Sequence, residues 1–164
     1  LDGAQLTALP PEIGQAAALE ILYLQNNKLT SLPGEIGKLT QVTELDLSNN
    51  DLTSLPPEIG QMTALRKLLL TGNQLTSLPP EIGKLTNLEE LDLGNNQLAA
   101  LPPEIGQMAN LWTLRVNGNR LTAFPAEMSQ LAHLTELDFE GNPVTELPQA
   151  LKDLSSLQIV RPEQ

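Results

Sequence analysis

Few residues in this chain could do chemistry, and their spacing follows a repeat rather than a catalytic arrangement. His133 is the only histidine, there is no cysteine, and serines such as Ser54 and Ser77 occupy equivalent turns. No glycine-rich phosphate loop follows a strand pattern, because the glycines recur at the period of the repeat. The sequence therefore predicts no catalytic residue, no cofactor and no enzyme activity.

Carboxylates are the abundant chemically active side chains, so metal binding is the next chemistry to consider. Glu136, Asp138 and Glu140 are closely spaced, and carboxylate oxygens are ligands that Ca²⁺ prefers. This set has neither a closing loop nor a cage of carbonyl groups around it. We therefore expect no metal site, and we interpret the acids as part of a charged surface.

The charge balance excludes some partners and favours others. Asp and Glu number 20 against 9 Lys and Arg, which gives a net charge of -11 and a pI near 4.3. A nucleic-acid or anionic membrane surface needs clustered cations, so neither is predicted as a partner. No apolar run is long enough to cross a bilayer. The lack of cysteine and of any Asn-x-Ser/Thr acceptor predicts a cytoplasmic location.

The elements that must position these residues come from a 23-residue repeat that covers the whole chain. Residues 1–18 form a partial copy, residues 19–156 form six full copies, and residues 157–164 form the C-terminal end of a single domain. Each copy opens with L-x-x-L-x-L-x-x-N-x-L and continues with L-P-x-E-I-G-x-L. The sequence resembles the leucine-rich repeat family, in the 23-residue form seen in Scribble-like scaffolds, Roco proteins, plant Ras-group proteins and bacterial proteins.

The spacing also explains the expected fold in physical terms. In Leu22-x-Leu24 the apolar residues alternate, so both point to one side of a short strand. Such a strand must pair with its equivalents 23 residues away, and the pairing is parallel because every copy runs in the same direction. Pro56-Pro57-Glu58 predicts a short helical start, in part 3₁₀, on the opposite face. The asparagine column, such as Asn50, is expected to bond backbone groups of its own turn and the next coil.

We therefore predict a right-handed α/β solenoid, a leucine-rich repeat horseshoe whose parallel sheet forms the concave face and whose short turns form the convex face. The outward strand positions vary between copies while the leucine frame does not, which favours a binding role for this face. Acids on alternate strands have a cation available between them, and such cross-strand pairs contribute tenths of a kcal/mol each. Seven acids face three bases if Arg161 is counted.

Candidate partner-binding residues are the charged outward positions and the few large apolar or aromatic side chains beside them. They are Tyr23, Glu44, Asp46, Lys67, Leu69, Glu90, Asp92, Trp112, Arg115, Glu136 and Asp138. For Trp112 and Leu69, packing against neighbouring side chains is an equally good interpretation.

The predicted function is non-catalytic recognition of a protein partner of basic character on the acidic concave face. The family resemblance implies that the chain is the recognition segment of a larger intracellular signalling protein. Two alternatives remain open: a regulatory segment of a multidomain enzyme such as a GTPase or ubiquitin ligase, and a natural or consensus-like scaffold without a specific ligand.

The two ends of the repeat array differ. The first copy begins in mid-unit without a polar cap, so we expect earlier residues or another chain to cover its apolar edge. At the other end, residues 148–157 predict an amphipathic turn or helix with Leu151, Leu154 and Leu157 facing inward. Pro162 at a strand position is typical of a natural terminus.

Overall fold

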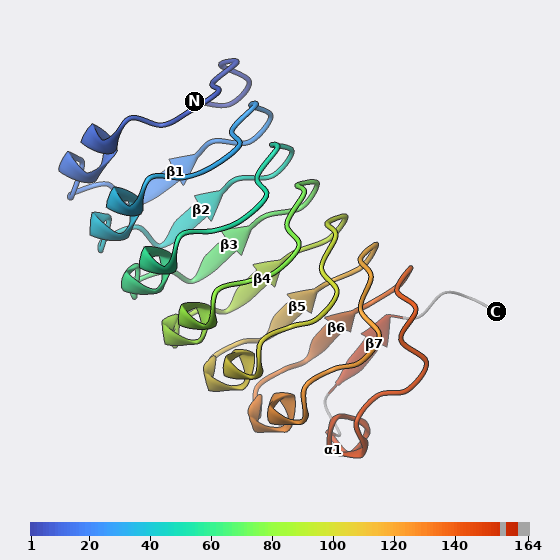
Figure 1. Ribbon diagram of the computed structural model, residues 1–164. Helices are drawn as coiled ribbons and strands as arrows, with labels where there is room; N and C mark the ends of the chain where they lie inside the picture. Colours follow the sequence, from blue (N-terminus) through green and yellow to red (C-terminus); the bar gives the residue numbers. More distant parts are fainter. Residues whose placement is uncertain (155–156, 161–164) are drawn as a thin grey trace.

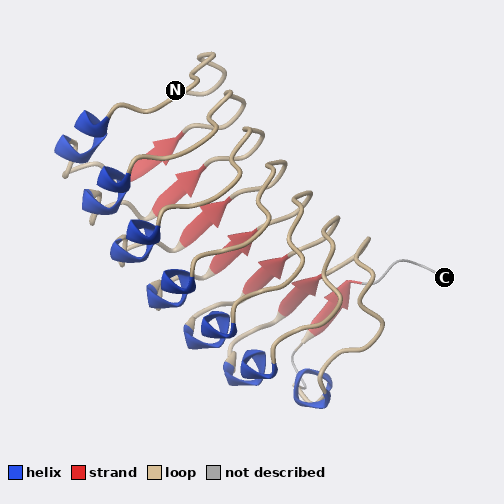
Figure 2. Cartoon of the chain, in the orientation of Figure 1, coloured by secondary structure: helices blue, strands red, loops and turns tan. Residues whose placement is uncertain are grey.

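The fold is a stack of coils in which each coil contributes one short strand and one helical turn. It is seen in a computed structural model that describes residues 1–154 and 157–160. The strands lie side by side in one sheet, and the helical turns form a second row on the other side of the chain (Figures 1 and 2). The strands are β1 (Ile21–Tyr23), β2 (Glu44–Asp46), β3 (Lys67–Leu69), β4 (Glu90–Asp92), β5 (Thr113–Arg115), β6 (Glu136–Asp138) and β7 (Gln158–Val160).

The sheet is parallel and its strands follow chain order from β1 to β7. Leu22 pairs with Leu45, and Leu45 pairs with Leu68, so neighbouring strands match at an offset of 23 residues. The middle residue of each strand from β1 to β6 is buried, while its two neighbours remain at least partly exposed. Period-two alternation in the sequence therefore separates a core face from a solvent-facing face, as predicted.

The helical turns opposite the sheet are 3₁₀ helices, apart from the last. They are η1 (Pro11–Gln15), η2 (Gly34–Lys38), η3 (Pro57–Gln61), η4 (Pro80–Lys84), η5 (Pro103–Gln107), η6 (Ala126–Gln130) and the α-helix α1 (Gln149–Lys152). In η3, Pro56 is extended before the helix and Pro57 starts it, where proline's missing N–H costs nothing. The N–H of Met62 then donates to the carbonyl of Ile59 at 3.2 Å and ends the helix after a single turn.

Leucines from the strands and isoleucines from the 3₁₀ helices fill the space between the two rows. Leu45, Ile59 and Leu68 have no exposed surface, and equivalent residues recur in each coil. Adjacent 3₁₀ helices approach so closely that a Cβ built on Gly37 would lie 2.5 Å from the backbone oxygen of Glu58. The repeat glycine is therefore required by coil-to-coil packing rather than by any ligand.

The asparagine column satisfies buried backbone groups between coils. Asn73 donates to the carbonyls of Leu70 and Leu47, each at 3.0 Å, and its Oδ1 accepts from the N–H of Leu52 at 3.0 Å. Leu47 and Leu52 belong to the preceding coil, so the expectation of bonds to the next coil was wrong in direction. The reason is geometric: the amide points back towards the coil that has already turned past it.

The two ends are less regular than the middle. At the N-terminal end Leu1 is exposed, and Ile13 and Leu19 are only partly buried, unlike their equivalents in later coils. Towards the C-terminus α1 buries Leu151 completely. Leu154 and Leu157 pack partly buried against the core, as predicted, although the helix covers fewer residues than the predicted range. Arg161 and Pro162 lie outside the described residues. The predicted solenoid fold is confirmed.

Candidate functional site

The solvent-facing side of the sheet, here called the concave face, arranges its side chains in rows across the strands. One row begins Ile21, Glu44 and Lys67, because these residues pair in register on β1, β2 and β3. A second row begins Tyr23 and Asp46 on the same strands. Neighbouring strands lie about 4.8 Å apart, so neighbours in a row are in contact range.

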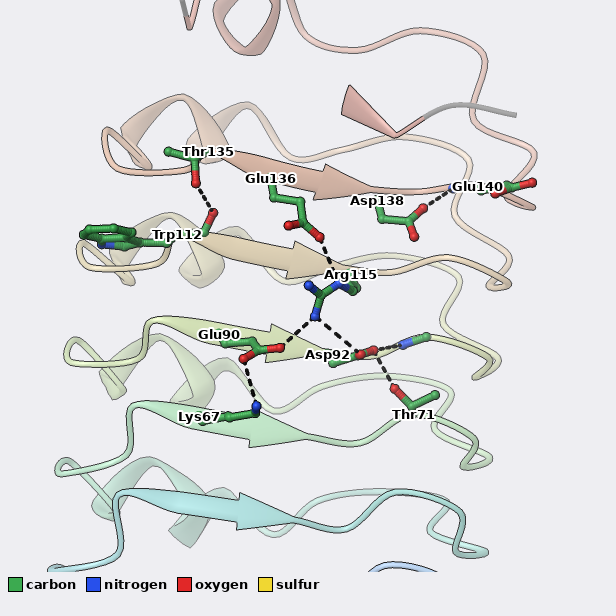
Figure 3. Close-up of polar contacts among 11 residues, drawn as sticks. Lys67, Thr71, Glu90, Asp92, Trp112, Arg115, Thr135, Glu136, Asp138 and Glu140 are labelled. Carbon is green, nitrogen blue, oxygen red and sulfur yellow. Dashed lines mark hydrogen bonds and ion pairs between the residues drawn. The ribbon is translucent and has the colours of Figure 1, made fainter. Parts of the chain in front are cut away.

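A chain of ion pairs crosses the middle of this face (Figure 3). Lys67 Nζ lies 3.2 Å from Glu90, and Arg115 Nη1 lies 2.7 Å from the same carboxylate. Arg115 Nε donates to Glu136 at 2.9 Å. The two cations thus neutralise the acids of β4 and one acid of β6, which confirms the predicted alternation of acids and cations across the strands.

The pKa of Glu90 records this pairing. Partial burial favours the neutral acid, but hydrogen bonds from Arg115 and Lys67 outweigh it and hold the pKa of Glu90 below its ordinary value. The Glu90 and Arg115 side chains are about one-quarter and one-third exposed, so water still screens the pair. The ladder is therefore a set of modest interactions that fixes side-chain positions more than it stabilises the fold.

The aspartates of the second row have a structural duty as well as a charge. Asp46 Oδ1 accepts from the N–H of Ser48 at 2.9 Å, and Asp92 Oδ1 accepts from the N–H of Gly94 at 2.9 Å. Asp92 also accepts from the Thr71 hydroxyl on β3 (Figure 3). These bonds hold the turn that follows each strand. Substitutions that remove the oxygen would consequently disturb the backbone along with the charge.

The edge at β1 differs from the centre. Ile21 and Tyr23 are 48% and 42% exposed, although most large apolar side chains are buried. A hydrogen bond with Glu44 raises the pKa of Tyr23, because ionising the phenol beside a carboxylate is unfavourable. Neither Glu44 nor Asp46 forms an ion pair with any described residue. This edge combines apolar surface with unneutralised negative charge.

Trp112 lies apart from the other predicted site residues. It immediately precedes β5 and is 57% exposed at the rim of the sheet (Figure 3). Only its backbone carbonyl forms hydrogen bonds to Thr135 and Glu136. Four strand spacings, about 19 Å, separate β5 from β1. The structure therefore does not bring Trp112 together with Tyr23 as one aromatic anchor.

Residues considered for chemistry lie in unremarkable surroundings. His133 is exposed in the turn before β6. Across residues 1–154 and 157–160, no group of three or more His, Cys, Asp or Glu side chains is placed to hold a metal ion. That same part of the chain has no helix with the length and hydropathy of a bilayer crossing.

Two features of the face were missed from the sequence. Ile21 was assigned to an outward position but not to the site, although its exposure equals that of Tyr23. The strand β7 was not given bounds, although Leu154, Leu157 and Ile159 repeat the L-x-x-L-x-L spacing that marks the other strands. A closer comparison of the last residues with the frame could have found the strand.

Comparisons with known proteins bear on the identity of the repeat. The family profile described as "Leucine-rich repeat region" matches residues 58–162, and the profile "Leucine Rich repeats (2 copies)" matches residues 17–57. The comparison with curated proteins finds no match.

Two solved structures are similar over almost the whole chain. One is a leucine-rich repeat protein of Leptospira interrogans, with a TM-score of 0.82 and 38% identity over 95% of this chain. The other is the leucine-rich repeat ectodomain of the membrane receptor kinase GASSHO1/SCHENGEN3 from Arabidopsis thaliana, solved in complex with CASPARIAN STRIP INTEGRITY FACTOR 2, with a TM-score of 0.83 and 36% identity over 93% of this chain. The alignments cover only 46% and 19% of those two chains.

Proposed function

The chain belongs to the leucine-rich repeat family, whose domains are generally non-catalytic protein-interaction modules, and on that premise we propose that it recognises a basic protein partner on its concave face. The observation that carries the proposal is the charge of this face. Seven carboxylates on β2, β4 and β6 and in the turn after β6 face two cations, Lys67 and Arg115. The ladder neutralises only part of this charge.

The mechanism is recognition by a preformed surface. Backbone bonds between coils and the asparagine column fix the strands, so binding need not order a loop. The uncompensated carboxylates would attract a cationic partner, which raises the association rate at low salt and lowers it as salt screens the charges.

The wider setting is also a proposal. The solved relatives are longer than this chain, which is consistent with a recognition segment inside a larger signalling protein. A cytoplasmic location rests on the lack of cysteine and of glycosylation acceptors alone. Cover of the apolar N-terminal edge by earlier residues or another chain is supported by the exposure of Leu1 and the partial burial of Leu19.

The experiment blocks one face at a time. Because the chain has no cysteine, a single cysteine can carry a bulky maleimide polymer either on the concave face, at Thr113, or on the helical face, at Gln107. The immobilised proteins are incubated with an extract of the source cells, and retained proteins are quantified by mass spectrometry. Loss of retained partners only with the Thr113 polymer supports the proposal, whereas equal retention by both labelled proteins refutes it.

A further inference from the structure

The β1 edge of the concave face carries a compact patch that differs from the rest of the sheet. Tyr23, Asp46 and Leu69 pair in register on β1, β2 and β3, and Ile21 pairs with Glu44. These five residues, which we call the β1–β3 patch, span two strand spacings, about 10 Å. They place three large apolar or aromatic side chains around two carboxylates.

The apolar part of the patch is accessible. Ile21 and Tyr23 are about half exposed, and Leu69 is partly exposed between Asp46 and Asp92. On the remaining strands from β4 to β6, every outward position is polar or charged. Exposed aromatic and aliphatic side chains gathered in one place are the usual anchors of protein interfaces.

The carboxylates of the patch lack a counter-charge within the described residues. Lys67 is the register neighbour of Glu44, yet its ammonium group lies 3.2 Å from Glu90 on the other side. Asp46 accepts only the N–H of Ser48 among its recorded side-chain bonds. A cation brought by a partner would therefore meet unpaired acids here.

The centre of the face is less suited to an anchor. Covering Glu90 and Arg115 would remove water from an ion pair that is already formed, and the cost of desolvation offsets any new contact. Towards β6, Asp138 and Glu140 are also without an ion pair among the described residues, but their neighbours on β5 are Thr113 and Arg115 rather than apolar side chains. Only the β1–β3 patch joins free charge to apolar surface.

We propose that the β1–β3 patch is the anchor of the binding face and that its occupant is an extended partner segment in which a lysine or arginine lies next to an aliphatic or aromatic residue. The cation of the segment pairs with Glu44 and Asp46, and its apolar side chain covers Ile21 and Tyr23. Both contacts lie within one strand spacing of each other, so adjacent or alternate residues of one extended segment reach them. The inference rests on the concave-face function proposed above.

The first test uses a display library of random short peptides selected on the unmodified chain. Enrichment of sequences that place Lys or Arg within two positions of a large apolar residue is expected, and binding of the synthetic selected peptide should weaken as salt is added. Selection of acidic or uncharged sequences would overturn the inference.

The second test locates the selected peptide. Replacing Ile21→Ser with Tyr23→Ser should weaken its binding about tenfold or more, since such anchors dominate affinity. Replacing Glu44→Gln with Asp46→Asn removes two charges but keeps the oxygen that holds Ser48, and should abolish most of the salt dependence. Trp112→Ser and the pair Glu12→Gln with Glu127→Gln are matched controls that remove an exposed aromatic and two convex charges elsewhere, and each should leave affinity unchanged.

The two proposals can fail separately. If the polymer on Thr113 blocks the peptide but the patch variants bind normally, the concave face is the binding face and the anchor is misplaced. If the polymer on Thr113 has no effect either, both proposals are wrong. Thermal unfolding of each variant shows whether it retains the fold, so a loss of binding without a loss of stability is attributable to the surface.

Discussion

Arg115 on β5 donates to Glu90 on β4 at 2.7 Å, and this contact joins two neighbouring strands of the concave face (Figure 3). The same guanidinium reaches Glu136 on β6, so one side chain bridges three strands. The contact explains why the centre of an acidic face has little uncompensated charge. It also yields a prediction about pH.

Replacing Arg115→Met should make stability less dependent on acid pH. The folded state holds the pKa of Glu90 below its ordinary value, so this pair contributes stability above pH 4.5 and loses it as pH falls through the lower, folded pKa. The contribution is about 0.5–1 kcal/mol, because both groups are partly exposed. Urea unfolding across the acid range measures it, with Arg120→Met as control because Arg120 forms no ion pair with a described residue. Identical pH profiles for Arg115→Met and Arg120→Met would contradict the interpretation.

Tyr23 offers a direct spectroscopic test of the β1 edge. It is the only tyrosine in the chain, so the absorbance of the phenolate titrates this group alone. The hydrogen bond with Glu44 favours the neutral phenol, and we expect ionisation at a pH above the ordinary value near 10. Glu44→Gln should bring the titration back towards that value, whereas Glu12→Gln should not. A titration of the unmodified protein that Glu44→Gln leaves in place would show that the contact is absent in solution.

The asparagine column predicts a graded loss of stability. Asn73→Ala leaves two carbonyls and one N–H without partners in a buried site, and about 3 kcal/mol of stability should be lost. Asn142→Ala removes equivalent bonds, but Asn142 is only half-buried and water can replace them. Its cost should be smaller, and denaturant unfolding gives both values. Equal losses would mean that burial does not control the effect.

The repeat glycines predict a packing effect without any change in charge. Gly37→Ala places a methyl group 2.5 Å from the backbone oxygen of Glu58, and the neighbouring coil must move to accept it. We expect a loss of about 1–3 kcal/mol, as for other overpacked sites. Gly14→Ala in the first coil meets its nearest backbone oxygen at 3.0 Å and should cost less. Thermal unfolding compares them, and a neutral Gly37→Ala would show that the coils are not held at this spacing.

Trp112 reports whether a partner extends across the face. It is the only tryptophan and is 57% exposed at the rim before β5, so acrylamide quenches its fluorescence without competition from other residues. A short peptide anchored on the β1–β3 patch should leave the quenching unchanged, because β1 and β5 are about 19 Å apart. Strong protection of Trp112 by such a peptide would place the anchor elsewhere.

The fold was predictable because the repeat constrains every coil in the same way. Leu22 and Leu24 alternate on a strand, and the same alternation 23 residues later fixes the direction and register of pairing. The proline pair before Glu58 likewise predicts where the short helix starts. Each of these signals is local and is repeated, so no long-range information is needed.

The site was predictable only as a surface. Alternation identifies which residues point outward, but it cannot say that Lys67 pairs with Glu90 rather than with Glu44, since both acids are its register neighbours. That choice depends on rotamers, and it decides which carboxylates remain free. The exposure of Ile21 likewise follows from its place on an edge strand, which one copy of the repeat cannot reveal.

The most direct measurement is a crystal structure of the chain with the tightest selected peptide. The account predicts that the peptide lies on the concave face, with a lysine or arginine nitrogen within ion-pair distance of Glu44 or Asp46 and an apolar side chain against Tyr23. A peptide bound on the row of 3₁₀ helices, or over β4 to β6 without contact to β1, would contradict it.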